Sequence, residues 1–330
     1  MISLNNIYIH GRYYYDGNLH LYNTASGIEF NFRGKTAHLS IKAEIGQLAE
    51  CWLRVIIDND DKNALDVKFG PQNQEICLFS KEIEENHNIK VFKVSEAIES
   101  HVCINDLKID GVFLDRPVYD YNLLVIGDST VSAYGNLGSI DDEHMLDDTD
   151  GLHSFASITA RMLELSPNIL SGSGWGLAFS PWTEPKRASI VSFYDKVAVK
   201  TGIDYDMKQI KPKLAIISLG TNDSYYIAEG EDGRTKTDLI SEFKLKYHDL
   251  LGKIKNDFGD IPILMLYGLM KERHNYDLMH QVYLDNKDYY NLYEVLLEGD
   301  GKGISAHPSA SSHRDIACKL VKLIKEIDSE

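Results

Sequence analysis

The chain has 330 residues, of which 43% are hydrophobic and 25% are charged, the composition of a globular protein long enough for two domains. Its formal net charge of −16 argues against nucleic acids and anionic membranes as partners, because both repel an acidic surface. Its four cysteines form no C-x-x-C pair, so neither a zinc site nor a dense disulfide framework is expected.

The first residues, MISLNNIYIHGRYYYDG, lack the basic start and the long apolar run of a signal peptide, so we expect a cytoplasmic protein. No window approaches the roughly 18 continuous apolar residues that a membrane span needs. Together with the acidic charge, these features favour a protein that acts on a neutral substrate.

Residues 1–118 are expected to form an all-β sandwich, similar to a jelly roll, as an accessory domain. Short runs with a period near two, among them GIEFNFRG, AHLSIKAEIG and CWLRVIID, alternate with clusters of Gly, Asn and Asp. Several short strands at such spacing are typical of a sandwich. The run VCINDLKIDGVFL is expected to be one more strand pair that turns at Asn105-Asp106. The pattern stops at Arg116-Pro117, where we place the domain boundary.

From Tyr119 the pattern changes to strands that alternate with helices. YNLLVIG, KLAIISL and IPILMLY are continuous apolar runs, as expected of strands that are covered on both faces. Helical spacing occurs in SFASITARMLEL, in DLISEFKLKYHDLLGKIKNDF and in the final SSHRDIACKLVKLIKEI. Residues 119–330 are therefore predicted to form a three-layer α/β domain with a parallel sheet, in which function gathers at the carboxyl ends of the strands.

Polar motifs follow these predicted strands, and together they offer what acyl transfer needs: a hydroxyl, a base and donors for an oxyanion. GDS ends the first strand and presents Ser129 as a nucleophile. HPS precedes the last helix and presents His307 as the general base. The backbone N–H groups of Ser129 and Gly174 and the side-chain amide of Asn222, in GTND, would form the oxyanion hole.

Each motif alone has a simpler structural interpretation. GDS can be a turn with a helix N-cap, GTND a turn, and a lone histidine a hydrogen-bonded surface residue. Packing does not account for their common order at the strand ends of one α/β domain, so we favour the catalytic interpretation.

These blocks resemble the SGNH/GDSL hydrolases, which are named for the Ser, Gly, Asn and His that stand here at Ser129, Gly174, Asn222 and His307. The G-x-S-x-G elbow of the α/β-hydrolases is absent. The order of a β-sandwich followed by such a domain resembles the architecture of carbohydrate esterase family 2. The segments YGLM and DGKGISAHPSASSH are also similar to that family. That resemblance implies removal of O-acetyl groups from polysaccharides such as xylan and mannan, without a metal or an organic cofactor.

One position departs from the general pattern of that superfamily. Many members carry an Asp three residues before the histidine, where this chain has Ile304. The resemblance to family 2 implies a Ser-His dyad in which a backbone carbonyl holds the imidazole. Asp300 is the nearest upstream acid and the alternative partner of His307, and His313 is the alternative base.

Further residues flank the motifs and are candidates for substrate contact, since aromatic faces beside a catalytic serine often stack on sugars. The candidates are Asp128, Trp175, Trp182, Asp223, Tyr225 and Tyr226. The acidic run at 140–151 does not match an EF-hand loop and is expected to be a solvated loop near the cleft.

The sequence therefore predicts a serine esterase that deacetylates a carbohydrate, with an acetylated oligosaccharide as its partner. A lysophospholipase or thioesterase on the same scaffold is an alternative, and so is a carbohydrate-binding protein with a vestigial hydrolase domain. The aromatic flanks favour sugar over lipid, and intact Ser129, Asn222 and His307 argue against a vestigial domain.

Overall fold

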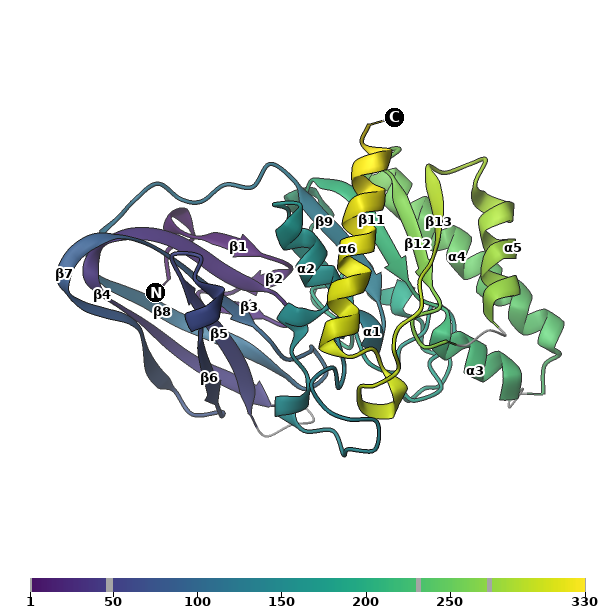
Figure 1. Cartoon of the computed structure of the whole chain (residues 1–330), viewed down its shortest axis with the longest axis horizontal. Coiled ribbons are helices and arrows are strands. Elements are labelled where there is room, and N and C mark those ends of the chain that lie inside the picture. Colours follow the sequence, from purple (N-terminus) through teal and green to yellow (C-terminus); the bar gives the residue numbers. More distant parts are fainter. Residues whose placement is uncertain (1, 46–49, 230–232, 272–274, 330) are drawn as a thin grey trace.

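The structure is a computed structural model that describes residues 2–45, 50–229, 233–271 and 275–329. The N-terminal part is an antiparallel eight-stranded sheet in the order β2-β3-β8-β4-β7-β5-β6, with β1 also paired to β4 (Figure 1). Its strands are β1 (Tyr8–His10), β2 (Tyr13–Tyr15), β3 (Leu19–Leu21), β4 (Gly27–Ile45), β5 (Cys51–Ile57), β6 (Leu65–Phe69), β7 (Gln74–Lys93) and β8 (Ser100–Phe113).

The sequence of β4 places its apolar side chains on the one face of the sheet that packs in the core. Its buried apolar side chains occupy even positions first and odd positions later: Ile28, Phe30, Phe32, then Ala37, Leu39, Ile41. Between these two groups, its pairing with β7 shifts register at Gly34 and Thr36. One extra residue in a strand moves all later side chains to the opposite face. The shift therefore keeps both halves of β4 facing the same core.

The expected strand pair at 102–114 is wrong, because β8 is one continuous strand of 14 residues. Asn105 and Asp106 lie where the pairing with β4 shifts register: Asp106 is opposite Ser40, and Ile104 is opposite Ile41. The polar pair thus accompanies a β-bulge, which uses the same residue types as a turn.

The C-terminal part is a parallel five-stranded sheet in the order β10-β9-β11-β12-β13. Its strands are β9 (Asn122–Gly127), β10 (Ser166–Ser171), β11 (Pro212–Ser218), β12 (Ile263–Tyr267) and β13 (Leu292–Leu296). Its helices are α1 (Ser129–Ser132), α2 (Phe155–Met162), α3 (Thr221–Glu229), α4 (Lys236–Phe258), α5 (Tyr276–Asn286) and α6 (Ala310–Ile327). The predicted α/β class with a parallel sheet is confirmed.

Helices cover both faces of the parallel sheet (Figure 1). Leu123 and Val125 of β9 belong to the core that contains α2 and α6, whereas Leu124 and Ile126 belong to the core that contains α4. The continuous apolar run of β9 is explained by this burial on both sides. Within the described ranges, no helix is both long enough and apolar enough to cross a membrane.

The two parts share their cores. Trp52 and Phe92 of the antiparallel sheet, and Val94 directly after β7, pack in the same cluster as Leu123 and Phe155. Apolar burial therefore continues from one domain into the other, and it fixes the N-terminal sheet against the parallel-sheet domain.

Candidate active site

Ser129 lies where the sequence predicted it, at the first residue after the turn that joins β9 to α1. The preceding Asp128 caps α1, because its carboxylate accepts hydrogen bonds from the N–H of Thr130 at 2.9 Å and from the hydroxyl of Thr130 at 2.8 Å. This cap fixes the start of the helix at Ser129 and holds its side chain at the carboxyl end of the sheet.

His307 contacts the serine. Its Nε2 lies 2.8 Å from Ser129 Oγ, and its Nδ1 lies 2.8 Å from the carbonyl oxygen of Ile304. A carbonyl can only accept, so the proton is on Nδ1 and Nε2 is free to accept the hydroxyl proton of Ser129. The two side chains come from segments 178 residues apart, and the fold joins them in the geometry of a nucleophile and its base.

The carbonyl that orients His307 belongs to a tight turn. Ser305 and Ala306, which follow Ile304, have φ angles of 52° and 64° in the left-handed region. The Ile304 side chain is buried, and a Cβ added to Gly135 would lie 2.4 Å from its Cβ. Position 304 therefore lies in a buried contact with the segment after α1, where an unpaired carboxylate would be costly.

The alternative partners have other roles. The Asp300 carboxylate accepts from the N–H of Ser309 at 2.9 Å and from its hydroxyl at 2.6 Å, so Asp300 supports the start of α6. His313 is fully buried and its Nδ1 accepts from the N–H of Phe155 at 3.2 Å. Burial lowers the pKa of His313 to about 3. Asp300 therefore does not orient His307, and His313 is not the base that contacts Ser129.

Burial also lowers the pKa of His307 below its ordinary value of 6.5, although the hydrogen bond to the Ile304 carbonyl opposes the shift. Desolvation disfavours the charged imidazolium. The ring is consequently neutral at pH 7, which is the form that can accept a proton from Ser129.

The other two predicted oxyanion donors, Gly174 and Asn222, lie on segments that contact each other and the residue before Ser129. Gly174 has a φ of +80°, and the structure provides no acceptor for its N–H within the described residues. The Asn222 side chain donates to the carbonyl of Trp175 at 2.9 Å and lies 3.5 Å from the Asp128 carboxylate. These contacts join Asn222 to the neighbour of Gly174 and to the neighbour of Ser129. The three predicted donors therefore belong to adjoining segments.

Burial separates the candidates for substrate contact into two groups. Four are at most 3% exposed and are too buried to offer a face to a sugar: Asp128, Trp175, Asp223 and Tyr226. This corrects the expectation for those four side chains. Trp182 and Tyr225 are 66% and 37% exposed, and their ring centroids lie 6.2 Å apart. Only this aromatic pair, of the six candidates, has the surface that stacking requires.

Asp223 instead holds the loop that follows β10. Its carboxylate accepts from the backbone N–H groups of Leu177, Ala178 and Phe179 at 2.7–2.8 Å. Burial raises the pKa of Asp223 to about 6, although these three donors favour the charged form. The loop that carries Gly174 is thus attached to the start of α3.

The N-terminal domain contributes a buried charged cluster that no sequence motif indicated. Glu96 accepts from the N–H and the hydroxyl of Ser173, at 3.0 and 2.9 Å, and Glu99 lies 2.8 Å from His144 Nε2. Both glutamates are 1% exposed. The segment SEAIES follows a strand pattern without any motif, so only the fold could reveal that it reaches the site.

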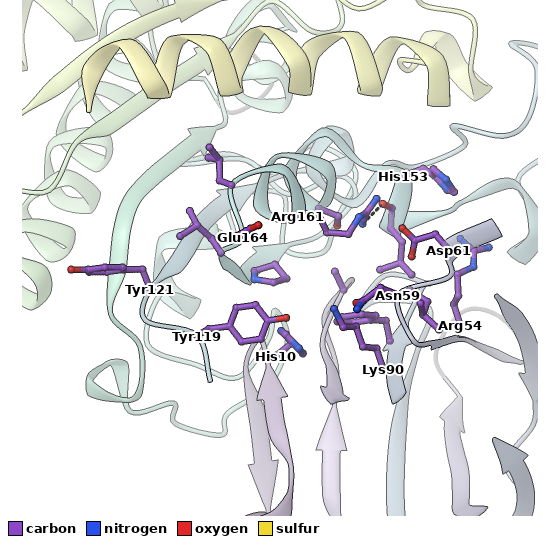
Figure 2. Close-up of a pocket in the computed structure, with 18 of the residues that line it drawn as sticks. His10, Arg54, Asn59, Asp61, Lys90, Tyr119, Tyr121, His153, Arg161 and Glu164 are labelled. Carbon is purple, nitrogen blue, oxygen red and sulfur yellow. Dashed lines mark hydrogen bonds between the residues drawn. The ribbon is translucent and has the colours of Figure 1, made fainter. Parts of the chain in front are cut away.

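A cavity of about 810 Å³ lies elsewhere, between the domains (Figure 2). His10 and Lys90 line it from the antiparallel sheet, and Tyr119 and Arg161 line it from the chain around β9 and α2. Tyr119 precedes β9, so this cavity is at the amino end of the parallel strands, and neither Ser129 nor His307 lines it. It is distinct from the candidate active site.

Two family models match the chain. Carbohydrate esterase 2 N-terminal matches residues 9–117, and GDSL-like Lipase/Acylhydrolase matches residues 123–315. The matches confirm the resemblance that the motifs indicated.

Two curated relatives carry related activities in their names. Cellulase/esterase CelE of Acetivibrio thermocellus is 26% identical over 316 residues, which are 92% of this chain and 37% of that protein. Acetylxylan esterase / glucomannan deacetylase of Cellvibrio japonicus is 24% identical over 212 residues, which are 61% of this chain and 58% of that protein. The chain thus spans less than two thirds of either relative.

A solved structure has the same architecture throughout. The family two carbohydrate esterase from Clostridium thermocellum in complex with cellohexaose matches with a TM-score of 0.86 at 25% identity, over 98% of this chain and 99% of that one. The chain therefore belongs to the GDSL-like lipase/acylhydrolase family and has the two-domain architecture of the family 2 carbohydrate esterases.

Proposed function

We propose that the chain is a serine esterase that removes O-acetyl groups from carbohydrate. The observation that carries this proposal is the hydrogen-bonded pair of Ser129 Oγ and His307 Nε2 at 2.8 Å, with Nδ1 held by the Ile304 carbonyl. The names of the two relatives, a cellulase/esterase and an acetylxylan esterase / glucomannan deacetylase, support the substrate class.

The mechanism follows from the positions of these groups. His307 Nε2 takes the hydroxyl proton while Ser129 Oγ bonds to the acetyl carbon, and the carbonyl π electrons move onto oxygen. The N–H groups of Ser129 and Gly174 donate to that oxyanion, and so does the Asn222 N–H whose contact with Asp128 is long, at 3.5 Å. His307 then protonates the departing sugar oxygen as the C–O bond breaks. Water, deprotonated by the same ring, then attacks the acyl carbon, and His307 returns the proton to Ser129 Oγ as the acyl bond breaks and acetate leaves.

A backbone carbonyl fixes the tautomer of His307 but stabilises the imidazolium less than a carboxylate would. The lowered pKa of His307 fits this design, because the base returns its proton readily. The carbonyl of an acetyl ester is more reactive toward a nucleophile than that of an amide. A weaker base is therefore sufficient for an ester substrate.

The exposed aromatic pair Trp182 and Tyr225 favours a sugar substrate, and the structural relative was solved with a cello-oligosaccharide bound.

One observation favours a second candidate, an acyl hydrolase for longer chains. Leu137, Ile140 and Met145 are 48–62% exposed, and the carbonyl of Ile140 accepts the N–H of Ser305 beside the base. Aliphatic side chains at that place would accept an acyl chain.

Hydrolysis of p-nitrophenyl acetate tests the esterase itself. Ser129→Ala should lower kcat at least about 10³-fold, since it removes the nucleophile. Ser241→Ala, on an exposed position of α4, is the matched control and should not change kcat. Wild-type protein that is no faster than Ser129→Ala would refute the esterase.

The substrate class is tested by comparing kcat/KM for acetylated xylo- and manno-oligosaccharides with that for p-nitrophenyl palmitate. A carbohydrate deacetylase should prefer the oligosaccharides by at least about tenfold, a difference of about 1.4 kcal/mol in transition-state binding. A preference for the long acyl chain would favour the second candidate.

A further inference from the structure

We infer that Glu96 of the N-terminal domain is a positioning residue for the oxyanion hole, so that the antiparallel-sheet domain completes the catalytic site of the other domain. The inference rests on the proposed function, which names Gly174 as an oxyanion donor. It assigns to the N-terminal domain a part in catalysis in addition to any contact with glycan.

The contact itself is direct. Glu96 lies on the segment between β7 and β8, and one carboxylate oxygen, Oε2, accepts from both Ser173 N at 3.0 Å and Ser173 Oγ at 2.9 Å. Ser173 is the residue before Gly174, so the peptide that carries the Gly174 N–H begins at a residue tied at two atoms. Hydrogen bonds to a carboxylate are shorter and stronger than neutral ones. The donor is thus held from the opposite domain.

The position of Glu96 is itself fixed. Lys93, which is fully buried, donates from Nζ to the carbonyl of Glu96 at 3.0 Å and to that of Ser95 at 2.6 Å. The N–H of Glu96 donates to the Glu99 carboxylate at 3.0 Å. Main-chain donor and acceptor of Glu96 are therefore both satisfied within one buried cluster. A side chain on so constrained a segment can hold a loop in place.

The same segment also reaches the base. His144 Nε2 donates to Glu99 at 2.8 Å, and this bond raises the pKa of His144 against the effect of burial. The ring centroid of Tyr134 lies 4.3 Å from that of His144 and 5.0 Å from that of His307. Packed rings in this row limit the movement of the His307 imidazole. Residues 96–99 thus support both the oxyanion loop and the base.

The cost of burying the Glu96 carboxylate indicates that this residue has a role besides packing. Glu96 and Glu99 lie in one buried cluster, and burial together with the charge of Glu99 raises the pKa of Glu96 to about 7. Buried carboxylates are costly to retain, and replacing such groups by apolar residues is often neutral or stabilising. A carboxylate aimed at the residue before an oxyanion donor is therefore better explained by positioning.

Glu96→Ala and Glu96→Gln test the inference with p-nitrophenyl acetate. Alanine should lower kcat about 10- to 100-fold with KM changed less than about twofold, since a small displacement of a catalytic donor costs rate. Glutamine, whose amide oxygen can still accept from Ser173, should recover part of the loss. The matched control is Glu29→Gln, a carboxylate of the same domain that is 5% exposed and bonds to His10 and Tyr119, at the amino end of the parallel strands and away from Ser173. It should leave kcat unchanged.

Amide hydrogen exchange of the peptide that contains Ser173 gives a readout that does not need activity. It should become faster in Glu96→Ala and remain at the wild-type rate in Glu29→Gln. An exchange rate and a kcat equal to those of the wild type would overturn the inference while leaving the esterase intact. If wild type shows no hydrolysis beyond Ser129→Ala, the proposed function fails instead, and the exchange rate alone decides whether Glu96 holds the loop.

Discussion

At the scale of single residues, the burial of His307 determines how the proposed activity depends on pH. The base must be neutral to accept a proton, and burial lowers its pKa below 6.5. We therefore expect kcat/KM to rise with pH and to level off with a midpoint below 6.5, so that activity persists in weakly acidic solution. A pH–rate profile with p-nitrophenyl acetate measures this. A midpoint above 7 would mean that a negative charge stabilises the imidazolium.

Trp182 is the residue for which sugar stacking has the clearest test. Loss of one aromatic face costs about 0.5–1.5 kcal/mol, so Trp182→Ala should raise KM for acetylated oligosaccharides about two- to thirteenfold. KM for p-nitrophenyl acetate should stay the same, because that substrate has no sugar rings. Tyr289→Ala is the control, since Tyr289 is also 66% exposed but precedes β13 at the amino end of the sheet. Equal effects on both substrates would contradict the stacking role.

At the scale of elements, the loop at 172–180 depends on Asp223 of α3 for its shape. Asparagine offers one acceptor oxygen where Asp223 uses two for three backbone donors, so Asp223→Asn leaves at least one buried N–H without a partner. We expect the free energy of unfolding to fall by about 1–3 kcal/mol and kcat to fall with it. Urea denaturation and kcat measure the two effects. An unchanged kcat would show that Gly174 keeps its place without this attachment.

The arrangement of the strands and helices also explains which parts of the fold and the site could be predicted from the sequence. The motif at Ser129 directly follows a strand and that at His307 directly precedes the last helix, and the continuous apolar strands imply a parallel sheet whose carboxyl ends meet. The strand pair expected at Asn105 was wrong because a bulge and a turn use similar residues. Glu96 could not be predicted, since its partner Ser173 is 77 residues away in another domain and the segment around Glu96 carries no motif.

At the scale of the whole molecule, buried polar groups reinforce the shared cores. Arg12 is fully buried and comes from the N-terminal domain. It donates to the side chain of Asn168 at 3.1 Å and to the carbonyls of Tyr194 and Lys196, each at 2.7 Å. Burial lowers its pKa to about 10, so it remains charged at neutral pH. These three acceptors lie in the other domain, so the interface stabilises the folded state of both domains.

We therefore expect the two domains to unfold in one calorimetric transition, with equal calorimetric and van't Hoff enthalpies. Arg12→Ala deprives buried acceptors of their donor, so it should lower the free energy of unfolding by about 3 kcal/mol. Arg33→Ala removes an exposed arginine paired with Glu84 and should change it by less than about 1 kcal/mol. Two separate wild-type transitions would contradict this coupling, since a domain that melts alone does not depend on the contacts that Arg12 makes across the interface.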